Sequence, residues 1–113
     1  MASTHVRMTV EWLLPLGQTR SVTMALHSLA ADIRGLRGCV GCSVSTDIGP
    51  RGAVRYMEEW QTEDHLRERL QSDVFMKLVT LIEDASQPPR IEFVLARGTR
   101  GLDFVEEVRG AAG

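Results

Sequence analysis

The chain has 113 residues, which is enough for one domain with a core of its own. Its formal net charge is −2 and its 13 lysines and arginines are scattered, so the composition argues against nucleic acid or an anionic membrane as a partner. The sequence has no run of 18 apolar residues, the length that a membrane span needs, and we expect no signal peptide at its start. We therefore expect a soluble, cytoplasmic protein with reduced cysteines.

The first predicted element is a strand over residues 6–14. Apolar side chains alternate there with mostly polar ones, and Pro15 and Gly17 follow as a stop. The predicted inner face consists of Val6, Met8, Val10, Trp12 and Leu14.

A helix is predicted next, over residues 22–36. Val22, Leu26, Leu29, Ile33 and Leu36 recur at steps of four and three, which places them on one helical face. Thr19 or Ser21 is expected to cap its start, and Gly35 or Gly38 its end.

The next stretch, CVGCSVSTDI, follows Gly38 and holds both cysteines. Its small and β-branched residues predict a second strand, with Cys39 and Cys42 on opposite faces because they are three apart. That geometry is poor for a disulfide or a shared metal, and no second cysteine pair completes a zinc site. We therefore expect two free thiols and no metal.

A hairpin follows, with a tight turn at residues 49–52 and a third strand over residues 53–60. Alternation places Val54, Tyr56, Glu58 and Trp60 on one face. An inward carboxylate needs a partner, which favours a salt bridge from Glu58 to an arginine over a role as a general base.

Two short helices come next. Thr62 is the expected cap of the first, and Ser72 with Asp73 that of the second, whose apolar face consists of Val74, Phe75, Leu78, Leu81 and Ile82. Residues 86–89 break the pattern, residues 91–96 alternate as a fourth strand, and residues 102–108 suggest a short fifth strand before a frayed end.

The predicted order is β-α-β-β-α-β, an α+β class fold. It is the ferredoxin-like, split-βαβ arrangement, with one antiparallel sheet and helices on one face. We expect a single domain over residues 1–113, with a core of about 5–97 and a C-terminal strand and tail at 98–113. Apolar residues on both strand faces, such as Trp12 and Met57, predict a homodimer that buries the uncovered face.

Four short motifs follow one another along the chain: Gly38–Cys39 opening a strand, Glu58-x-Trp60 ending the next, Leu66 on the following helix and Ser72-x-x-Phe75. Together they resemble the antibiotic biosynthesis monooxygenase (ABM) domain family of the dimeric α/β-barrel superfamily. The resemblance covers about residues 5–97. It implies a dimeric α/β barrel and a cofactor-independent monooxygenase whose substrate is an electron-rich quinol, phenol or anthrone.

The resemblance also implies a site. Trp60, Leu29, Phe75 and Leu78 would bind the small aromatic molecule, and Tyr56, His65 or Arg69 would move a proton or stabilise an oxyanion. Arg69 stands where many members have a histidine. No flavin, haem or metal is expected, since haem-degrading relatives carry an axial histidine where this chain has Val79.

Each of these residues also has a structural interpretation. Trp60 and Tyr56 are candidates for core positions, while Arg69 and His65 are candidates for solvated surface positions. The missing histidine favours a second hypothesis, in which the chain is a non-catalytic dimer of the same fold that binds a small molecule or a partner. Whether the protein is an enzyme stays open at this level.

Overall fold

The computed structural model describes residues 5–46 and 52–112 of the chain. Strands and helices follow one another as β1 (Val6–Leu13), α1 (Leu16–Arg34), β2 (Cys39–Thr46), β3 (Ala53–Trp60), α2 (Glu63–Gln71), α3 (Phe75–Glu83), β4 (Arg90–Leu95), β5 (Gly98–Arg100) and α4 (Asp103–Ala112). Most of the tight turn expected at 49–52 lies outside the described residues.

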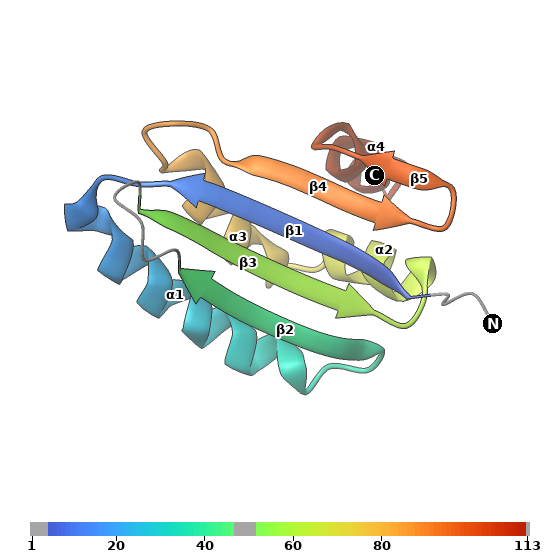
Figure 1. Cartoon of the computed structure of the whole chain (residues 1–113). Helices are drawn as coiled ribbons and strands as arrows, with labels where there is room; N and C mark the ends of the chain where they lie inside the picture. Colours follow the sequence, from blue (N-terminus) through green and yellow to red (C-terminus); the bar gives the residue numbers. More distant parts are fainter. Residues whose placement is uncertain (1–4, 47–51, 113) are drawn as a thin grey trace.

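The sheet is antiparallel throughout, in the order β2-β3-β1-β4-β5 (Figure 1). β1 lies at its centre, with Val10 opposite Tyr56 of β3 on one side and Ile91 of β4 on the other. Helix α1 leads from β1 to β2, past the intervening β3, and α2 with α3 leads from β3 to β4, past β1. The predicted α+β, ferredoxin-like fold and the hairpin of β2 and β3 are therefore confirmed.

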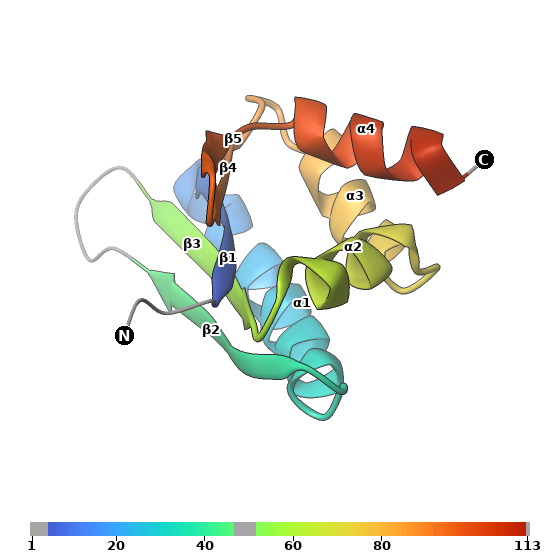
Figure 2. The same cartoon turned by 90° about the vertical axis from the view of Figure 1, so that its right-hand side faces the viewer.

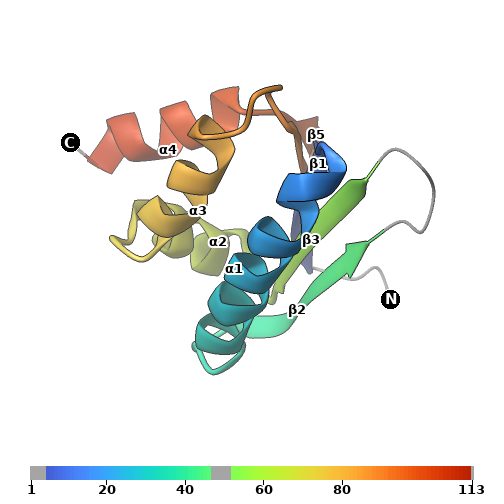
Figure 3. The ribbon, with the colours of Figure 1, turned by 90° about the vertical axis from the view of Figure 1, so that its left-hand side faces the viewer.

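All four helices lie on one face of the sheet (Figures 2 and 3). The core fills the space between the two layers. The predicted inner faces of β1 and β3 are confirmed, because all of their residues are buried. The largest fully buried side chains are Trp12, Trp60, Tyr56, Phe75, Phe93, Phe104 and Met8. Among the described residues, no helix is both long and apolar enough to cross a lipid bilayer.

The face of the sheet away from the helices is mainly polar. Its central hollow is lined by charged and hydroxyl side chains around one apolar residue, Met57. Leu13 and Val94 are further apolar side chains of this face, since the strand register places them there. Apolar residues thus occur on both strand faces, as expected, but on the uncovered face they are few, because the outward positions of the strands are mostly polar or charged.

Helix α1 begins earlier than predicted. Its first residue is Leu16, directly after Pro15, and neither Thr19 nor Ser21 caps it. Proline is well suited to a helix start because its ring presets a helical φ and its missing N–H would be unpaired there. Gly35 is the C-cap, as predicted, whereas Leu36 lies beyond the helix and is exposed.

The two cysteines do not lie on opposite faces of β2 as predicted, because the strand contains a β-bulge. The register of β2 against β3 shifts between Cys39 and Gly41, so that Cys39 pairs with Trp60 and Cys42 with Glu58. The extra residue, Val40, is exposed. Both cysteines therefore face the helices, rather than opposite sides, because a bulge inserts one residue without a partner. Both are free thiols.

Residues 102–108 are not a strand, so that prediction is wrong. The fifth strand is Gly98–Arg100, and α4 follows it. Phe104, Val105 and Val108 are buried, at the spacing of three and four that one helical face requires. Phe104 packs against Phe93 of β4 with ring centroids 5.0 Å apart, and this contact holds α4 over the sheet.

Helices α2 and α3 lie where the sequence predicted. Thr62 caps α2 by accepting a hydrogen bond from the backbone N–H of His65. Ser72 Oγ accepts from the N–H of Phe75 at the start of α3, at 3.3 Å. Val74 is exposed and does not belong to the buried face of α3.

Candidate functional site

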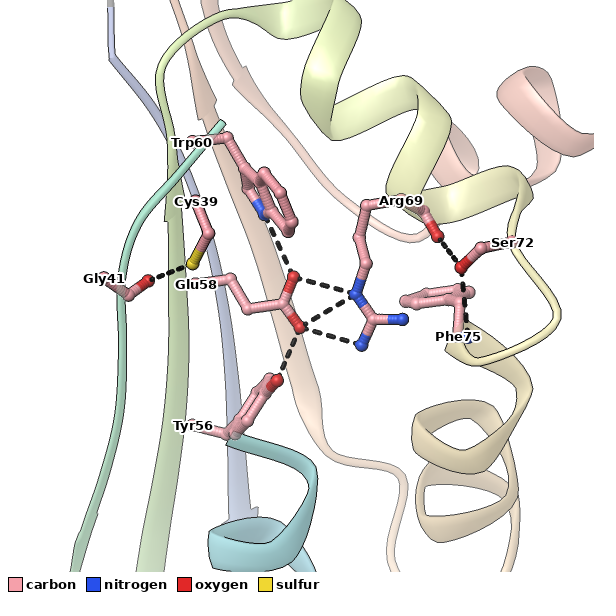
Figure 4. A network of polar contacts seen from close by, with 8 residues as sticks. All are labelled: Cys39, Gly41, Tyr56, Glu58, Trp60, Arg69, Ser72 and Phe75. Carbon is pink, nitrogen blue, oxygen red and sulfur yellow. Dashed lines mark hydrogen bonds and ion pairs between the residues drawn. The ribbon is translucent and has the colours of Figure 1, made fainter. Parts of the chain in front are cut away.

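A carboxylate lies in the core, at the centre of a polar network (Figure 4). Strand alternation turns Tyr56, Glu58 and Trp60 of β3 toward the helices, and Glu58 is 0% exposed. The Tyr56 hydroxyl donates to Glu58 Oε2 at 2.5 Å, and Trp60 Nε1 donates to Oε1 at 3.0 Å. Two neutral donors thus satisfy part of the hydrogen-bonding capacity of this carboxylate.

The counter-charge is Arg69 of α2. Its Nη2 lies 3.0 Å from Glu58 Oε2, and its Nε lies 3.2 Å from Oε1. The arginine partner expected for Glu58 is therefore confirmed. The surface interpretation of Arg69 is wrong, because only 3% of it is exposed. Burial acts to lower the pKa of Arg69, but the charge of Glu58 and the hydrogen bonds to it raise the pKa above its ordinary value.

The network around Glu58 is closed. An ionised carboxylate offers about four acceptor positions, and the donors from Tyr56, Trp60 and Arg69 occupy them. Burial and the negative charge of Glu58 both raise the pKa of Tyr56 strongly, so this hydroxyl stays a neutral donor. The group is built to join β3 to α2, and it offers no acceptor directed toward a ligand.

The Ser72-x-x-Phe75 motif connects this network to the third helix. Ser72 Oγ donates to the carbonyl of Arg69 at 2.7 Å and accepts from the N–H of Phe75. The guanidinium of Arg69 lies over the Phe75 ring, with Cζ 5.2 Å from its centroid (Figure 4). Arg69 Nη1, which points away from Glu58, is buried and has no hydrogen-bond partner in the structure.

His65 does not join the other two predicted catalytic residues. Its Nδ1 lies 2.7 Å from Thr62 Oγ1, within the cap of α2. Its ring packs so closely on Gly38 that a Cβ there would lie 2.3 Å from it, and Gly38 has a positive φ of +84°. His65 therefore fastens α2 to the turn before β2.

The two thiols lie beside the same network. Burial raises the pKa of Cys39, and it raises that of Cys42 to about 11. In both cases the nearby charge of Glu58 acts in the same direction. A thiol with a raised pKa is a weak nucleophile near neutral pH, so neither cysteine is suited to covalent chemistry.

An apolar cavity of about 260 Å³ lies between the sheet and helices α3 and α4. Its walls come from β1, β4, α3 and α4. The apolar lining residues are Met8, Val10, Phe75, Met76, Val79, Ile82, Ile91, Phe93, Leu102 and Val105. A lining of this character suits a small aromatic or aliphatic molecule, since ligand pockets are mostly apolar with a few polar groups.

Three charged residues also line this cavity: Glu83, Glu106 and Arg109. Arg109 is half-buried and donates from Nη1 to the carbonyl of Leu70 at 2.6 Å, whereas both glutamates are exposed. The sequence interpretation missed Glu106 and Arg109 because it treated their segment as a strand and tail. The signal was there, since an apolar 104-105-108 pattern interleaved with charges indicates an amphipathic helix.

Of the four residues expected to bind the ligand, Phe75 lines this cavity. Trp60, Leu29 and Leu78 are buried in the core and are not among its lining residues. Tyr56 and Arg69 are not lining residues either. They belong to the network around Glu58, which Arg69 connects to Phe75. Within residues 5–46 and 52–112, no group of three or more histidine, cysteine, aspartate or glutamate side chains is placed to hold a metal ion.

Comparison with known proteins identifies the fold. No model of a protein family matches the sequence, and no curated protein matches it. Among solved structures, a conserved protein of Methanosarcina mazei superposes with a TM-score of 0.71 at 17% identity, over 80% of this chain and 91% of that one. A protein of Caulobacter crescentus, provisionally named an antibiotic biosynthesis monooxygenase, gives 0.70 at 16% identity, over 83% and 91%.

A third structure is named an antibiotic biosynthesis monooxygenase. It gives a TM-score of 0.67 at 18% identity, over 80% of this chain and 97% of that one. At these identities the likeness concerns the fold. It confirms the ABM-type, ferredoxin-like fold that the motifs indicated.

Proposed function

We propose that the protein is a cofactor-independent monooxygenase that oxidises a small, electron-rich aromatic molecule of the quinol, phenol or anthrone class. The observation that carries this proposal is the apolar cavity beside α4, which combines two aromatic walls, Phe75 and Phe93, with charged groups. The names of two neighbours of the same fold support the reaction class.

The chemistry follows from the substrate. Loss of a proton from a phenol or anthrone leaves an anion that can transfer an electron to dioxygen. Over the whole reaction one oxygen atom enters the substrate as a carbonyl, the other leaves as water, and the substrate supplies all the electrons. The protein must therefore bind the aromatic, exclude bulk water and stabilise the anion. No flavin or metal is required for this reaction.

Within this proposal, Tyr56 and Arg69 are positioning residues. Their network holds Glu58, and Arg69 stacks on Phe75, which lines the cavity. Such a support keeps an aromatic wall in one orientation. His65 is assigned a structural role at the cap of α2.

Oxygen uptake with a defined probe tests the proposal. Purified protein and anthrone should consume one dioxygen per anthrone and release anthraquinone faster than the buffer alone. Val105→Trp and Val79→Trp place an indole in the cavity and should each abolish the acceleration. Val40→Trp, at an exposed position outside the lining, is the matched control. An unaccelerated reaction, with a probe shown to bind, would contradict the proposal.

One observation favours the second hypothesis, a non-catalytic binding protein of the same fold. The acceptor positions of Glu58 are all occupied by Tyr56, Trp60 and Arg69, and the one unpartnered donor of this group, Arg69 Nη1, is buried, so no base there is open to a ligand. This hypothesis predicts aromatic binding in the cavity, sensitive to Val105→Trp, without any oxygen uptake. The same pair of measurements therefore separates the two.

We also propose that the protein is a homodimer joined through the open face of the sheet. Half-buried Met57 lies at the centre of this face, among charges of both signs such as Arg55 and Glu11, which pair at 2.7 Å. A face with both signs can be self-complementary, as a two-fold symmetric interface requires. A second sheet over it would complete the barrel.

A further inference from the structure

Helix α4 brings two opposite charges to the cavity. Glu106 and Arg109 are three residues apart, so their side chains lie one above the other on the helix surface. Both line the cavity. A ligand at this part of the wall would therefore lie near both a carboxylate and a guanidinium.

Arg109 is held in place by the protein itself. Its Nη1 donates to the carbonyl of Leu70 at 2.6 Å, from the end of α2. This bond uses one of five N–H donors and orients the planar guanidinium. A ligand oxygen in the cavity would meet the remaining donors, since Arg109 is one of the lining residues.

We infer that Glu106 and Arg109 ionise a phenolic oxygen of the ligand, Glu106 as proton acceptor and Arg109 as donor to the resulting anion. The inference rests on the proposed function, because it requires an aromatic ligand in the cavity. In this step the ligand O–H bond, which anthrone presents in its enol tautomer, breaks and the proton passes to a Glu106 carboxylate oxygen. The electron pair remains on the ligand oxygen, whose negative charge lies against Arg109.

The arrangement favours Glu106 over Glu83 as the proton acceptor. Among the described residues, the titratable groups that line the cavity are Glu83, Glu106 and Arg109. Glu83 ends α3, whereas Glu106 is on the same helical face as Arg109. The three-residue spacing on one helix places the side chains of Glu106 and Arg109 next to each other, whereas Glu83 reaches the cavity from another helix.

The test uses 4-nitrophenol, whose phenolate absorbs visible light, as a probe of binding and ionisation. Its apparent pKa when bound is read by titrating absorbance with the protein in excess. Arg109→Gln should raise that pKa by about 1 to 3, since an opposite charge at close range lowers the pKa of an acid by this amount. Glu106→Gln should lower it, because a neighbouring negative charge is removed.

Glu107→Gln is the matched control. It makes the same charge change on α4, at an exposed position outside the cavity lining, and should leave the pKa of the bound probe unchanged. In the oxygen-uptake assay, Glu106→Gln should lower turnover by about 100- to 10,000-fold, the usual contribution of a general base. Its probe binding should be retained.

The outcomes separate this inference from the proposed function. Failure of 4-nitrophenol and anthrone to bind would contradict both. Binding that Val105→Trp abolishes, with the same probe pKa in Arg109→Gln and wild type, would overturn the inference alone. Full turnover in Glu106→Gln, or a loss confined to Glu83→Gln, would also overturn it.

Discussion

The guanidinium of Arg69 lies over the ring of Phe75, 5.2 Å from Cζ to the ring centroid, while two of its nitrogens bind Glu58. Phe75 also lines the apolar cavity. One buried arginine thus connects a carboxylate of β3 with the wall of the candidate site. A substitution of Glu58 should therefore affect the position of Phe75 in the cavity wall, and a substitution of Phe75 should affect the Glu58 network.

Removing one member of the Glu58–Arg69 pair should strongly destabilise the fold. Arg69→Met leaves a buried carboxylate without its counter-charge, which costs about 3–5 kcal/mol. The double variant Glu58→Leu with Arg69→Met should recover only part of this loss, because the Tyr56 hydroxyl and Trp60 Nε1 still lose their acceptor. Urea unfolding of both single variants and the double variant measures the coupling.

The partly exposed pair Glu63–Arg67 of α2, on the helical side of the molecule, is the control for that cycle. It has the same charges at 2.9 Å, but its two side chains are 35% and 36% exposed. Solvent screening limits such a helical pair to about 0.3–0.5 kcal/mol. Equal coupling energies in the two cycles would show that burial does not set the strength of the Glu58–Arg69 interaction.

Substitution of Trp60 should separate stability from ligand binding. Trp60→Phe removes the Nε1–H donor to a buried carboxylate and should cost about 1.5–3 kcal/mol, whereas Trp60→Ala should cost about 3–5 kcal/mol. Because Trp60 does not line the cavity, a folded Trp60→Phe variant should bind an aromatic probe as the wild type does. Weaker binding by this variant would return Trp60 to the ligand site.

Stability should fall in alkaline solution, with Cys42 as one cause. Burial raises its pKa from 9.0 in the unfolded chain to about 11 in the folded protein. Between these pH values the thiol has lost its proton in the unfolded chain but keeps it in the folded protein. Ionisation therefore stabilises the unfolded state relative to the native state. The loss attributable to Cys42 is about 2 kcal/mol from pH 9 to pH 11.

Cys42→Ala removes this contribution. Its free energy of unfolding should decline less steeply than that of the wild type above pH 9, and in parallel with it below. Urea unfolding from pH 7 to pH 11 gives both curves. Tyr56 should add to the alkaline loss in both proteins, since its pKa is also raised. Identical slopes for the two proteins would refute the assignment to Cys42.

Sedimentation should find a dimer at micromolar concentration. Met57→Glu places a charge at the centre of the open face and should yield a folded monomer, because a buried unpaired carboxylate opposes association. Met24→Glu, at a strongly exposed position of α1 on the helical side, should remain dimeric. A wild type that sediments as a monomer, or a dimeric Met57→Glu variant, would exclude this interface.

The local sequence pattern was sufficient to predict those features that depend only on neighbouring residues. The alternation of Val54, Tyr56, Glu58 and Trp60 identified the inner face of β3. The helical steps of α1 identified Leu26, Leu29 and Ile33 as buried, although Leu36 of the same pattern is exposed. The need of an inward carboxylate for a cation also followed from the sequence. It did not say which arginine would serve, because Arg69 has the local surroundings of a surface residue.

The sequence by itself therefore determined the order of strands and helices through residue 97, the faces that β1 and β3 bury and the presence of an inward charge, since these depend on period and polarity alone. Only the tertiary structure decided the bulge that turns Cys39 toward Glu58, the pairing of Glu58 with Arg69 and the cavity beneath α4. These depend on which distant segments pack together. Packing is decided by shape and charge across the whole chain, and no window of neighbouring residues contains that information.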